Sequence, residues 1–255
     1  MNFDEIKNYW ESRAAADSSA QSTTQDYYLR EIEYNVLLEH LQKYSPALVA
    51  DVGCGDGRTT SRLAAKLANI QFSGFDYSTS MVRNAVTQLA SSSLANIKFD
   101  QVDICQGLEG CYDLIYTTRC LINLPSWELQ RLAIDNIHAS LKKSGVYLMI
   151  ENFVEGQNNF NGIRKNFGLP EIPIREHNFF FQRASLEDHC RGRFEIIEEI
   201  NISSSYYLVS RVIYSKICSQ TSQQPDYLDD HHRYAAGLPF SGEFGPVRLV
   251  CLRKI

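Results

Sequence analysis

Three glycines stand two residues apart where an apolar segment gives way to a helical pattern. The run Asp51-Val52-Gly53-Cys54-Gly55-Asp56-Gly57-Arg58 follows directly from the apolar residues 47–50. Glycine lets the backbone turn tightly and approach a ligand, and the N-terminus of the helix that follows favours negative charge. The chemistry that this pattern predicts is nucleotide binding at a strand-to-helix turn.

Two kinds of nucleotide site compete for this turn. A dinucleotide-binding GxGxxG loop needs its third glycine at position 58, where the chain has Arg58, and the third glycine comes one residue early. Asp51 is also unusual ahead of such a loop. The phosphate-binding motif GxxxxGK[ST] is absent from the chain. These features count against a dinucleotide-binding site, and an NAD-dependent oxidoreductase is kept as the alternative hypothesis.

The elements around the turn alternate between strand and helix patterns. Strands separated by helical segments pair in parallel through right-handed crossovers, with helices on both faces. We therefore expect an α/β fold, a Rossmann-like doubly wound and mostly parallel seven-stranded sheet. The expected strands are 47–52, 71–75, 97–102, 112–117, 146–150, 194–202 and 247–252, and the expected helices are 3–12, 29–41, 57–67, 78–89 and 126–141.

The run 51–57 resembles motif I of the class I S-adenosylmethionine-dependent methyltransferases. Further segments of that family follow in its order: 72–78 for the second strand, 103–104 for the pair around adenine, 112–115 for the fourth strand and 141–146 for the turn into the fifth. The resemblance covers roughly residues 45–150. It implies S-adenosylmethionine as methyl donor, S-adenosylhomocysteine as product, and no metal.

The resemblance also implies which residues bind the donor. Asp76 would hold the ribose hydroxyls, because a carboxylate accepts two hydrogen bonds from a diol, and Asp103 would accept from the exocyclic amine of adenine. Arg30 would meet the carboxylate of the donor, and Asp51 would bond to loop amides. The expected donor-binding set is Asp51, Gly53, Cys54, Gly55, Asp76, Tyr77, Met81, Asp103, Ile104, Thr118 and Arg30.

The domain organisation follows from the same resemblance. Residues 1–44 are expected to form an N-terminal helical cap, and residues 45–255 the methyltransferase domain. Within that domain, 152–192 and 203–243 are expected to cover the acceptor site. The segment 152–192 reads as irregular with one or two short helices, and 203–218 fits either a helix or a strand.

Acceptor contacts are expected beyond the fourth and fifth strands. Enzymes that methylate exocyclic amines of DNA bases or protein glutamine carry [DN]PP[YF] there, and this chain does not. Arg119 is expected either to hold a carboxylate or phosphate or to form a structural ion pair. The expected substrate-binding set is Arg119, Asn152, Arg175 and Tyr207, with Tyr206, Tyr214, Tyr27 and Tyr28 as further aromatic candidates.

Methyl transfer from a sulfonium is an in-line displacement, so the protein mainly aligns nucleophile, methyl and sulfur. A base is needed only for a hydroxyl or a protonated amine. His177 is the first candidate, because imidazole titrates near neutrality, and His232 is its rival. His231 and His232 beside Asp229 and Asp230 also suggest a metal cluster, which we consider the weaker interpretation.

Composition narrows the partners. A net charge of −5 and a pI near 5.7 disfavour nucleic acid as the main partner. Neither a secretory signal nor a membrane-spanning run is evident, and seven scattered cysteines are typical of free thiols, so we expect a cytoplasmic protein without membrane insertion. The expected acceptor is a hydroxyl, less often an amine, of a small molecule or of a sugar or glycan-linked compound. A non-catalytic module that binds the donor and a homodimer remain open.

Overall fold

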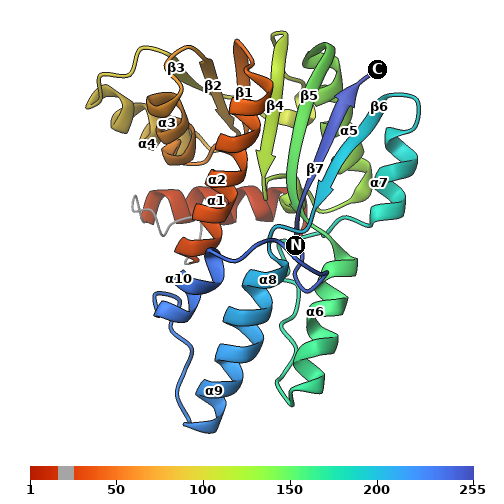
Figure 1. Ribbon diagram of the computed structural model, residues 1–255. Helices are drawn as coiled ribbons and strands as arrows, with labels where there is room; N and C mark the ends of the chain where they lie inside the picture. Colours follow the sequence, from red (N-terminus) through yellow and green to blue (C-terminus); the bar gives the residue numbers. More distant parts are fainter. Residues whose placement is uncertain (17–25) are drawn as a thin grey trace.

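Seven strands form one mixed sheet in the order β3-β2-β1-β4-β5-β7-β6 (Figure 1). The first five strands pair in parallel, and β7 runs antiparallel to both β5 and β6. This computed structural model describes residues 1–16 and 26–255. The predicted seven-stranded, mostly parallel sheet is confirmed. The strands are β1 (Leu48–Val52), β2 (Gln71–Asp76), β3 (Ile97–Gln101), β4 (Tyr112–Thr118), β5 (Leu141–Asn152), β6 (Phe194–Ile200) and β7 (Val247–Lys254).

Helices cover both faces of the sheet and extend beyond the carboxyl ends of its parallel strands (Figure 1). They are α1 (Phe3–Ala16), α2 (Tyr27–Tyr44), α3 (Arg58–Lys66), α4 (Thr79–Ala90), α5 (Trp127–Ser140), α6 (Val154–Asn166), α7 (Arg183–Cys190), α8 (Ser204–Tyr207), α9 (Tyr214–Gln220) and α10 (Asp230–Ala236), with the 3-10 turns η1 (Ile104–Gln106) and η2 (Leu121–Asn123) and the π-helix η3 (Leu208–Ile213). None of these helices, within the described part of the chain, is long and apolar enough to cross a bilayer.

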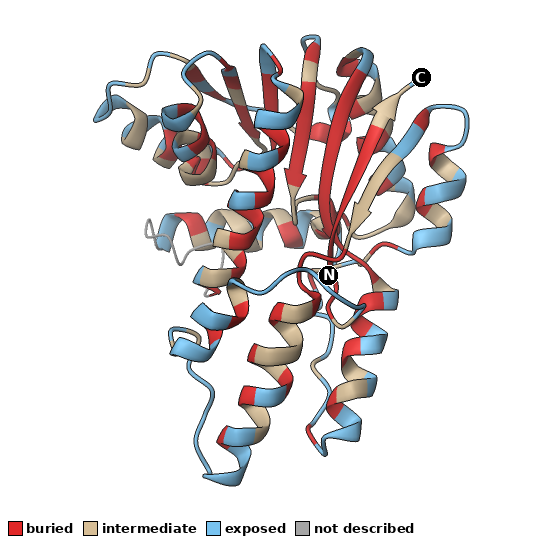
Figure 2. Ribbon diagram, in the orientation of Figure 1, coloured by how far each residue is buried: buried red, intermediate tan, exposed pale blue. Residues whose placement is uncertain are grey.

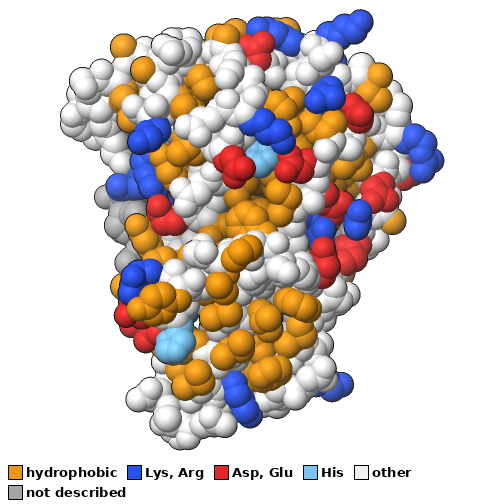
Figure 3. Space-filling view, in the orientation of Figure 1, with side chains coloured by type: hydrophobic (Ala, Val, Ile, Leu, Met, Phe, Trp, Pro, Cys, Tyr) orange, Lys and Arg blue, Asp and Glu red, His pale blue; other side chains and the backbone are white. Residues whose placement is uncertain are grey.

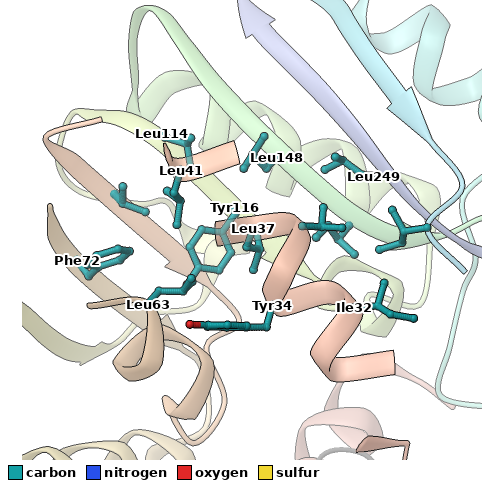
Figure 4. Packing of buried hydrophobic residues seen from close by; sticks show 14 of the residues in the cluster. Ile32, Tyr34, Leu37, Leu41, Leu63, Phe72, Leu114, Tyr116, Leu148 and Leu249 are labelled. Carbon is teal, nitrogen blue, oxygen red and sulfur yellow. The ribbon is translucent and has the colours of Figure 1, made fainter. Parts of the chain in front are cut away.

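Two apolar cores lie on opposite faces of the sheet, because the central strands are buried on both sides (Figure 2). On one face, Leu37 and Leu41 of α2 pack among Leu114, Tyr116 and Leu148 (Figure 4). The helix α2 is thus part of this core. By contrast, α1 lies across the carboxyl ends of the parallel strands (Figure 1). Ligands bind at this end of the strands in open α/β sheets.

Helix starts follow local capping rules. Ser78 caps α4, since its Oγ accepts a hydrogen bond from the N–H of Met81 at 3.1 Å. Asp26 caps α2 in the same way, accepting from the N–H of Leu29 at 3.1 Å. These caps fix where α2 and α4 begin, and α2 begins next to α10, beyond the carboxyl ends of the strands (Figure 1).

The segment left open at 203–218 is helical, so its strand interpretation is wrong. Tyr206, Ser210, Tyr214 and Cys218 are all buried. A spacing of four residues puts them on one face of a helix, and this face packs inward although the segment is rich in strand-forming residues.

Charged side chains are scattered over the face seen in Figure 3, whereas hydrophobic side chains gather over the helices below the sheet. Phe167 at the end of α6, Ile213 of η3 and Ile217 of α9 are exposed. The seven cysteines are free, with Cys105, Cys190, Cys218 and Cys251 buried and Cys111 exposed.

Candidate active site

A cavity of about 460 Å³ opens at the carboxyl ends of β1, β2, β4 and β5. This volume suits a drug-sized ligand. The glycine turn after β1 forms its floor. The helix α1 and the loop 172–178 form part of its wall, and α6 and η3 line it on the side away from the sheet.

The glycine turn has a backbone that other residues adopt only with strain. The φ angles of Gly53, Gly55 and Gly57 are +81°, +56° and +71°. A Cβ at Gly53 would lie 2.3 Å from Cys120 Sγ, and one at Gly57 would lie 2.5 Å from the ring of Phe99. The close approach of these neighbours, as well as the turn itself, requires glycine here.

Asp76 ends β2 beside this turn. Its Oδ2 accepts from the N–H of Gly55 and its Oδ1 from the N–H of Ser78, each at 2.9 Å. Burial raises the pKa of this carboxyl to about 6, against the lowering effect of the two N–H groups. Asp76 lines the cavity, and a carboxylate at this point suits a ligand that offers the two hydroxyls of a ribose.

Asp103 and Asp51 have partners within the protein. Asp103 accepts from Lys7 of α1 at 2.6 Å, which fastens α1 over the cavity. Asp51 accepts from the hydroxyls of Thr60, at 2.5 Å, and Tyr116, at 2.9 Å. Both hydroxyls bond to Oδ2, and the hydrogen bonds of the described residues include none from a loop amide to Asp51. Burial raises its pKa to about 7.

The structure brings the whole expected donor-binding set to one cavity. All eleven residues line it, namely Asp51, Gly53, Cys54, Gly55, Asp76, Tyr77, Met81, Asp103, Ile104, Thr118 and Arg30. Their convergence, with an acid at the end of β2 and a glycine turn after β1, fits an adenosyl ligand.

Arg119 lies at the cavity wall in an ion pair. Its Nε and Nη2 donate to the two carboxylate oxygens of Glu33 at 2.6 and 3.1 Å. Burial raises the pKa of Glu33, and the charge of Arg119 opposes that shift. Of the two roles expected for Arg119, the geometry matches the structural ion pair, because the guanidinium is held by a buried carboxylate of α2.

Glu151 is a site-forming residue whose role the sequence did not reveal. Its carboxylate accepts from the backbone N–H groups of Cys120, Leu121 and Ile122 at 3.1, 2.9 and 3.3 Å. Burial raises its pKa to about 7. This one carboxylate thereby holds the loop after β4 against the end of β5. Its only sequence signal was a polar residue at a strand end.

His177 lines the cavity beneath α1 and is 8% exposed. Its ring stacks on that of Tyr9 with 4.7 Å between centroids, and it meets Trp10 edge-on at 5.7 Å. Burial lowers the pKa of this imidazole, and the positive charges of Arg175 and Arg13 lower it further. These effects favour the neutral imidazole, which is the form that can accept a proton.

His232 does not reach the cavity, so its proposed catalytic role is not supported. It is buried, and its Nδ1 lies 2.9 Å from the hydroxyl of Tyr206, which donates to Asp26. The neighbouring His231 bonds to Asp229 at 2.6 Å. The two histidines therefore point to separate partners and do not form the metal cluster considered from sequence.

Of the aromatic candidates, too, some line the cavity and others do not. Tyr207 lines the cavity, whereas Tyr206 and Tyr214 are buried elsewhere. Asn152 and Arg175 also line it, as expected. Trp10, Phe160, Arg211 and Tyr227 complete the wall and were not predicted, because they come from helices and a loop whose positions the sequence left open.

Four buried polar atoms of the cavity wall have no hydrogen-bond partner in the described structure. They are Thr118 Oγ1, Asn152 Oδ1, Asn178 Oδ1 and Arg211 Nε. Leaving a buried polar group unpaired costs about 1–3 kcal/mol. Arg211 belongs to the π-helix η3, a form that is frequent at functional sites.

Comparisons with known proteins agree with this geometry. A family model described as a methyltransferase domain matches residues 46–187. Because the match covers more than half of the chain, the chain belongs to this family. The predicted methyltransferase is confirmed, and the nicotinamide-dependent alternative is not supported.

Two curated relatives match part of the chain. One, named trans-aconitate 2-methyltransferase, is from Deinococcus radiodurans and is 39% identical over 79 residues, which is 31% of this chain and 29% of that protein. The other, a putative methyltransferase of invertebrate iridescent virus 6, is 27% identical over 114 residues, or 44% of this chain and 40% of that protein. The chain thus matches less than half the length of either.

Solved structures match over nearly the whole chain. Magnesium protoporphyrin IX methyltransferase from Synechocystis PCC 6803, with bound S-adenosylhomocysteine, has a TM-score of 0.63 at 18% identity and 99% coverage of both chains. An N-methyltransferase from Bradyrhizobium japonicum WM9 has a TM-score of 0.58 at 13% identity, covering 99% of this chain and 97% of that one. The fold is that of the class I S-adenosylmethionine-dependent methyltransferases.

Proposed function

We propose that this chain transfers the methyl group of S-adenosylmethionine to a hydroxyl of a small polar acceptor, with a sugar or sugar-linked compound as the acceptor class. The observation that carries the proposal is the set of unpaired atoms in the cavity wall that lie outside the expected donor-binding set, Asn152 Oδ1, Asn178 Oδ1 and Arg211 Nε. A ligand that supplies their missing partners recovers the cost of leaving them unpaired.

Hydroxyls match these atoms better than other groups do. A hydroxyl both donates and accepts, so it satisfies the two asparagine oxygens and the arginine N–H alike. The match holds if either amide is turned to present its nitrogen. A carboxylate only accepts, and an ammonium only donates, so each satisfies part of the set. Tyr207, Phe160 and Trp10 line the same cavity and offer aromatic faces for a sugar ring.

His177 is proposed as the general base. The hydroxyl oxygen attacks the methyl carbon, the carbon–sulfur bond breaks with its electron pair returning to sulfur, and the hydroxyl proton passes to the neutral imidazole. Asp76 and the turn 53–57 would hold the adenosyl part of the donor. The remaining work is alignment of nucleophile, methyl and sulfur.

The test is an acceptor screen with methyl-labelled S-adenosylmethionine, read by mass spectrometry of the products and by release of S-adenosylhomocysteine. The panel pairs sugars and sugar nucleotides with their deoxy analogues, and adds amines and trans-aconitate. We expect label in an ether of a hydroxylated acceptor and none in the matched deoxy compound. Transfer to amines or carboxylates alone would overturn the proposed acceptor class. Asp76→Ala serves as the control that lacks the donor anchor.

A further inference from the structure

A second group of chemistry-bearing side chains lies away from the cavity, where α2 packs against β6 and β7. His40 of α2, Glu198 of β6 and Cys251 of β7 each offer one ligand atom, and these atoms all lie within 4.8 Å of one another. Among the described residues it is the one group of three or more such side chains that could hold a metal ion. None of the three lines the active-site cavity.

His40 presents to this group a ring nitrogen that makes no hydrogen bond. Its Nδ1 lies 2.8 Å from the carbonyl oxygen of Val36, which can only accept, so the proton of the neutral ring is on Nδ1. Its Nε2 is buried, makes no hydrogen bond and lies 3.4 Å from Glu198 Oε2. A backbone carbonyl that fixes the ring of a histidine in this way is usual for metal-ligating histidines.

An irregularity in β6 brings Glu198 to the same side. The register between β6 and β7 shifts between Ile196 and Glu198, and Glu198 then pairs with Cys251. An extra residue in a strand re-aims the side chains that follow it. Glu198 and Cys251 therefore both face α2, where His40 lies.

We propose that His40, Glu198 and Cys251 bind a zinc ion that ties α2 to the edge of the sheet. Imidazole nitrogen, carboxylate oxygen and cysteine sulfur are the ligand types that zinc takes, and three protein ligands leave a fourth position for water. A thiolate and a carboxylate balance the two charges of the ion. The proton of the Cys251 thiol leaves to solvent as the sulfur–zinc bond forms.

Glu198 is open to solvent, and Lys43 would compete with a metal ion for its carboxylate. Its side chain is 29% exposed, so an ion can reach the group from solvent. Lys43 Nζ lies 2.7 Å from Glu198 Oε2 and competes for that carboxylate. The Lys43 side chain is 51% exposed, and an exposed ion pair of this kind is weak, so zinc can displace it.

The test uses the full chain, stripped of metal with a chelator, and zinc chloride as the probe, with magnesium chloride as the matched salt. We expect calorimetry to show one zinc ion per chain and the melting temperature to rise by roughly 5–10 °C when free zinc is a hundred times Kd. Neither effect is expected with magnesium. Absence of zinc binding overturns the proposal.

Variants locate the ion. His40→Gln and Cys251→Ser should lose the zinc-dependent shift, whereas Cys218→Ser, at another buried cysteine, should keep it. Lys43→Ala should bind zinc several-fold more tightly. Undiminished binding in both ligand variants would place the ion elsewhere and overturn the proposal.

If a ligand variant fails to fold, the absorption spectrum of cobalt bound to the wild-type protein is the deciding measurement. Thiolate-to-cobalt charge-transfer absorption supports Cys251 as a ligand, and its absence excludes it. These results do not depend on the methyl-transfer proposal.

Discussion

The carboxylate of Asp76 and the backbone N–H of Gly55 are joined by a hydrogen bond of 2.9 Å, although the two residues are 21 positions apart. The bond ties the end of β2 to the turn that follows β1. The hydrogen bond thus holds the backbone of the turn and the carboxylate of Asp76 in fixed relative positions before any donor binds. Such preorganisation lowers the entropy cost of binding.

A methyl group added to the turn should break it. Gly53→Ala puts a Cβ within 2.3 Å of Cys120 Sγ, on a backbone with φ of +81°. We expect a loss of at least ~2 kcal/mol in the free energy of unfolding, with donor affinity reduced more than tenfold. Urea unfolding and calorimetric titration with S-adenosylhomocysteine measure the two effects.

Gly162→Ala is the matched control. Gly162 lies in α6 with no atom within 4 Å of its added Cβ. Alanine is favoured over glycine inside helices, so this variant should gain up to ~1 kcal/mol and keep donor affinity. Equal behaviour of the two variants would show that the turn is not constrained as described.

The pH dependence of turnover should report His177. Burial and the charges of Arg175 and Arg13 lower the pKa of His177. The base should therefore stay neutral, and active, at pH values below those at which an ordinary imidazole becomes protonated. Arg175→Gln removes a positive charge and should move the acidic limb of kcat/KM to higher pH. His177→Gln should lower kcat by about 10²–10⁴ and remove that limb. An acidic limb that persists unchanged in His177→Gln would assign the base elsewhere.

The unpaired amides should affect the acceptor and not the donor. Asn152→Ala and Asn178→Ala each remove one buried oxygen that lacks a partner. Since each is expected to bond to an acceptor hydroxyl, kcat/KM for the acceptor should fall roughly 5–10-fold, or about 1 kcal/mol. The Kd of S-adenosylhomocysteine should stay within twofold. A change in donor affinity with unaltered acceptor kinetics would contradict this assignment.

Glu151 should make stability depend on pH. Its pKa is about 7 in the folded protein against an ordinary 4.5, because burial disfavours the charge. The folded state therefore holds a proton that the unfolded state releases. The contribution of Glu151 to stability is full below pH 4.5 and is lost as pH rises through 7, by about 3 kcal/mol in all.

Glu151→Gln removes this titration while Asp51 and Asp76 titrate in both proteins. Urea unfolding at pH 4.5 and pH 8 should show wild type losing about 3 kcal/mol more than the variant over that interval. The same loss in both proteins would mean that Glu151 does not titrate in this range.

How much the sequence predicts depends on how local the signal is. The turn 53–57, Asp76 and Asp103 each lie at or just after the end of a strand, so the parallel sheet brings them together without further information. The ion pair between Arg119 and Glu33 joins residues 86 positions apart, and only the packing of α2 on the sheet creates it. His232 was misjudged because its partner Tyr206 comes from another helix, and Arg211 was missed because the helical course of 203–218 was open.

The claim that this cavity binds the methyl donor is tested most directly by calorimetric titration of S-adenosylmethionine, with NAD as the competing ligand and Asp76→Ala as the variant. We predict one site for S-adenosylmethionine in the wild-type protein, binding weakened at least tenfold in folded Asp76→Ala, consistent with the loss of a charged hydrogen-bond acceptor, and no binding of NAD. Binding of NAD, or unchanged affinity for S-adenosylmethionine in the variant, would contradict the account.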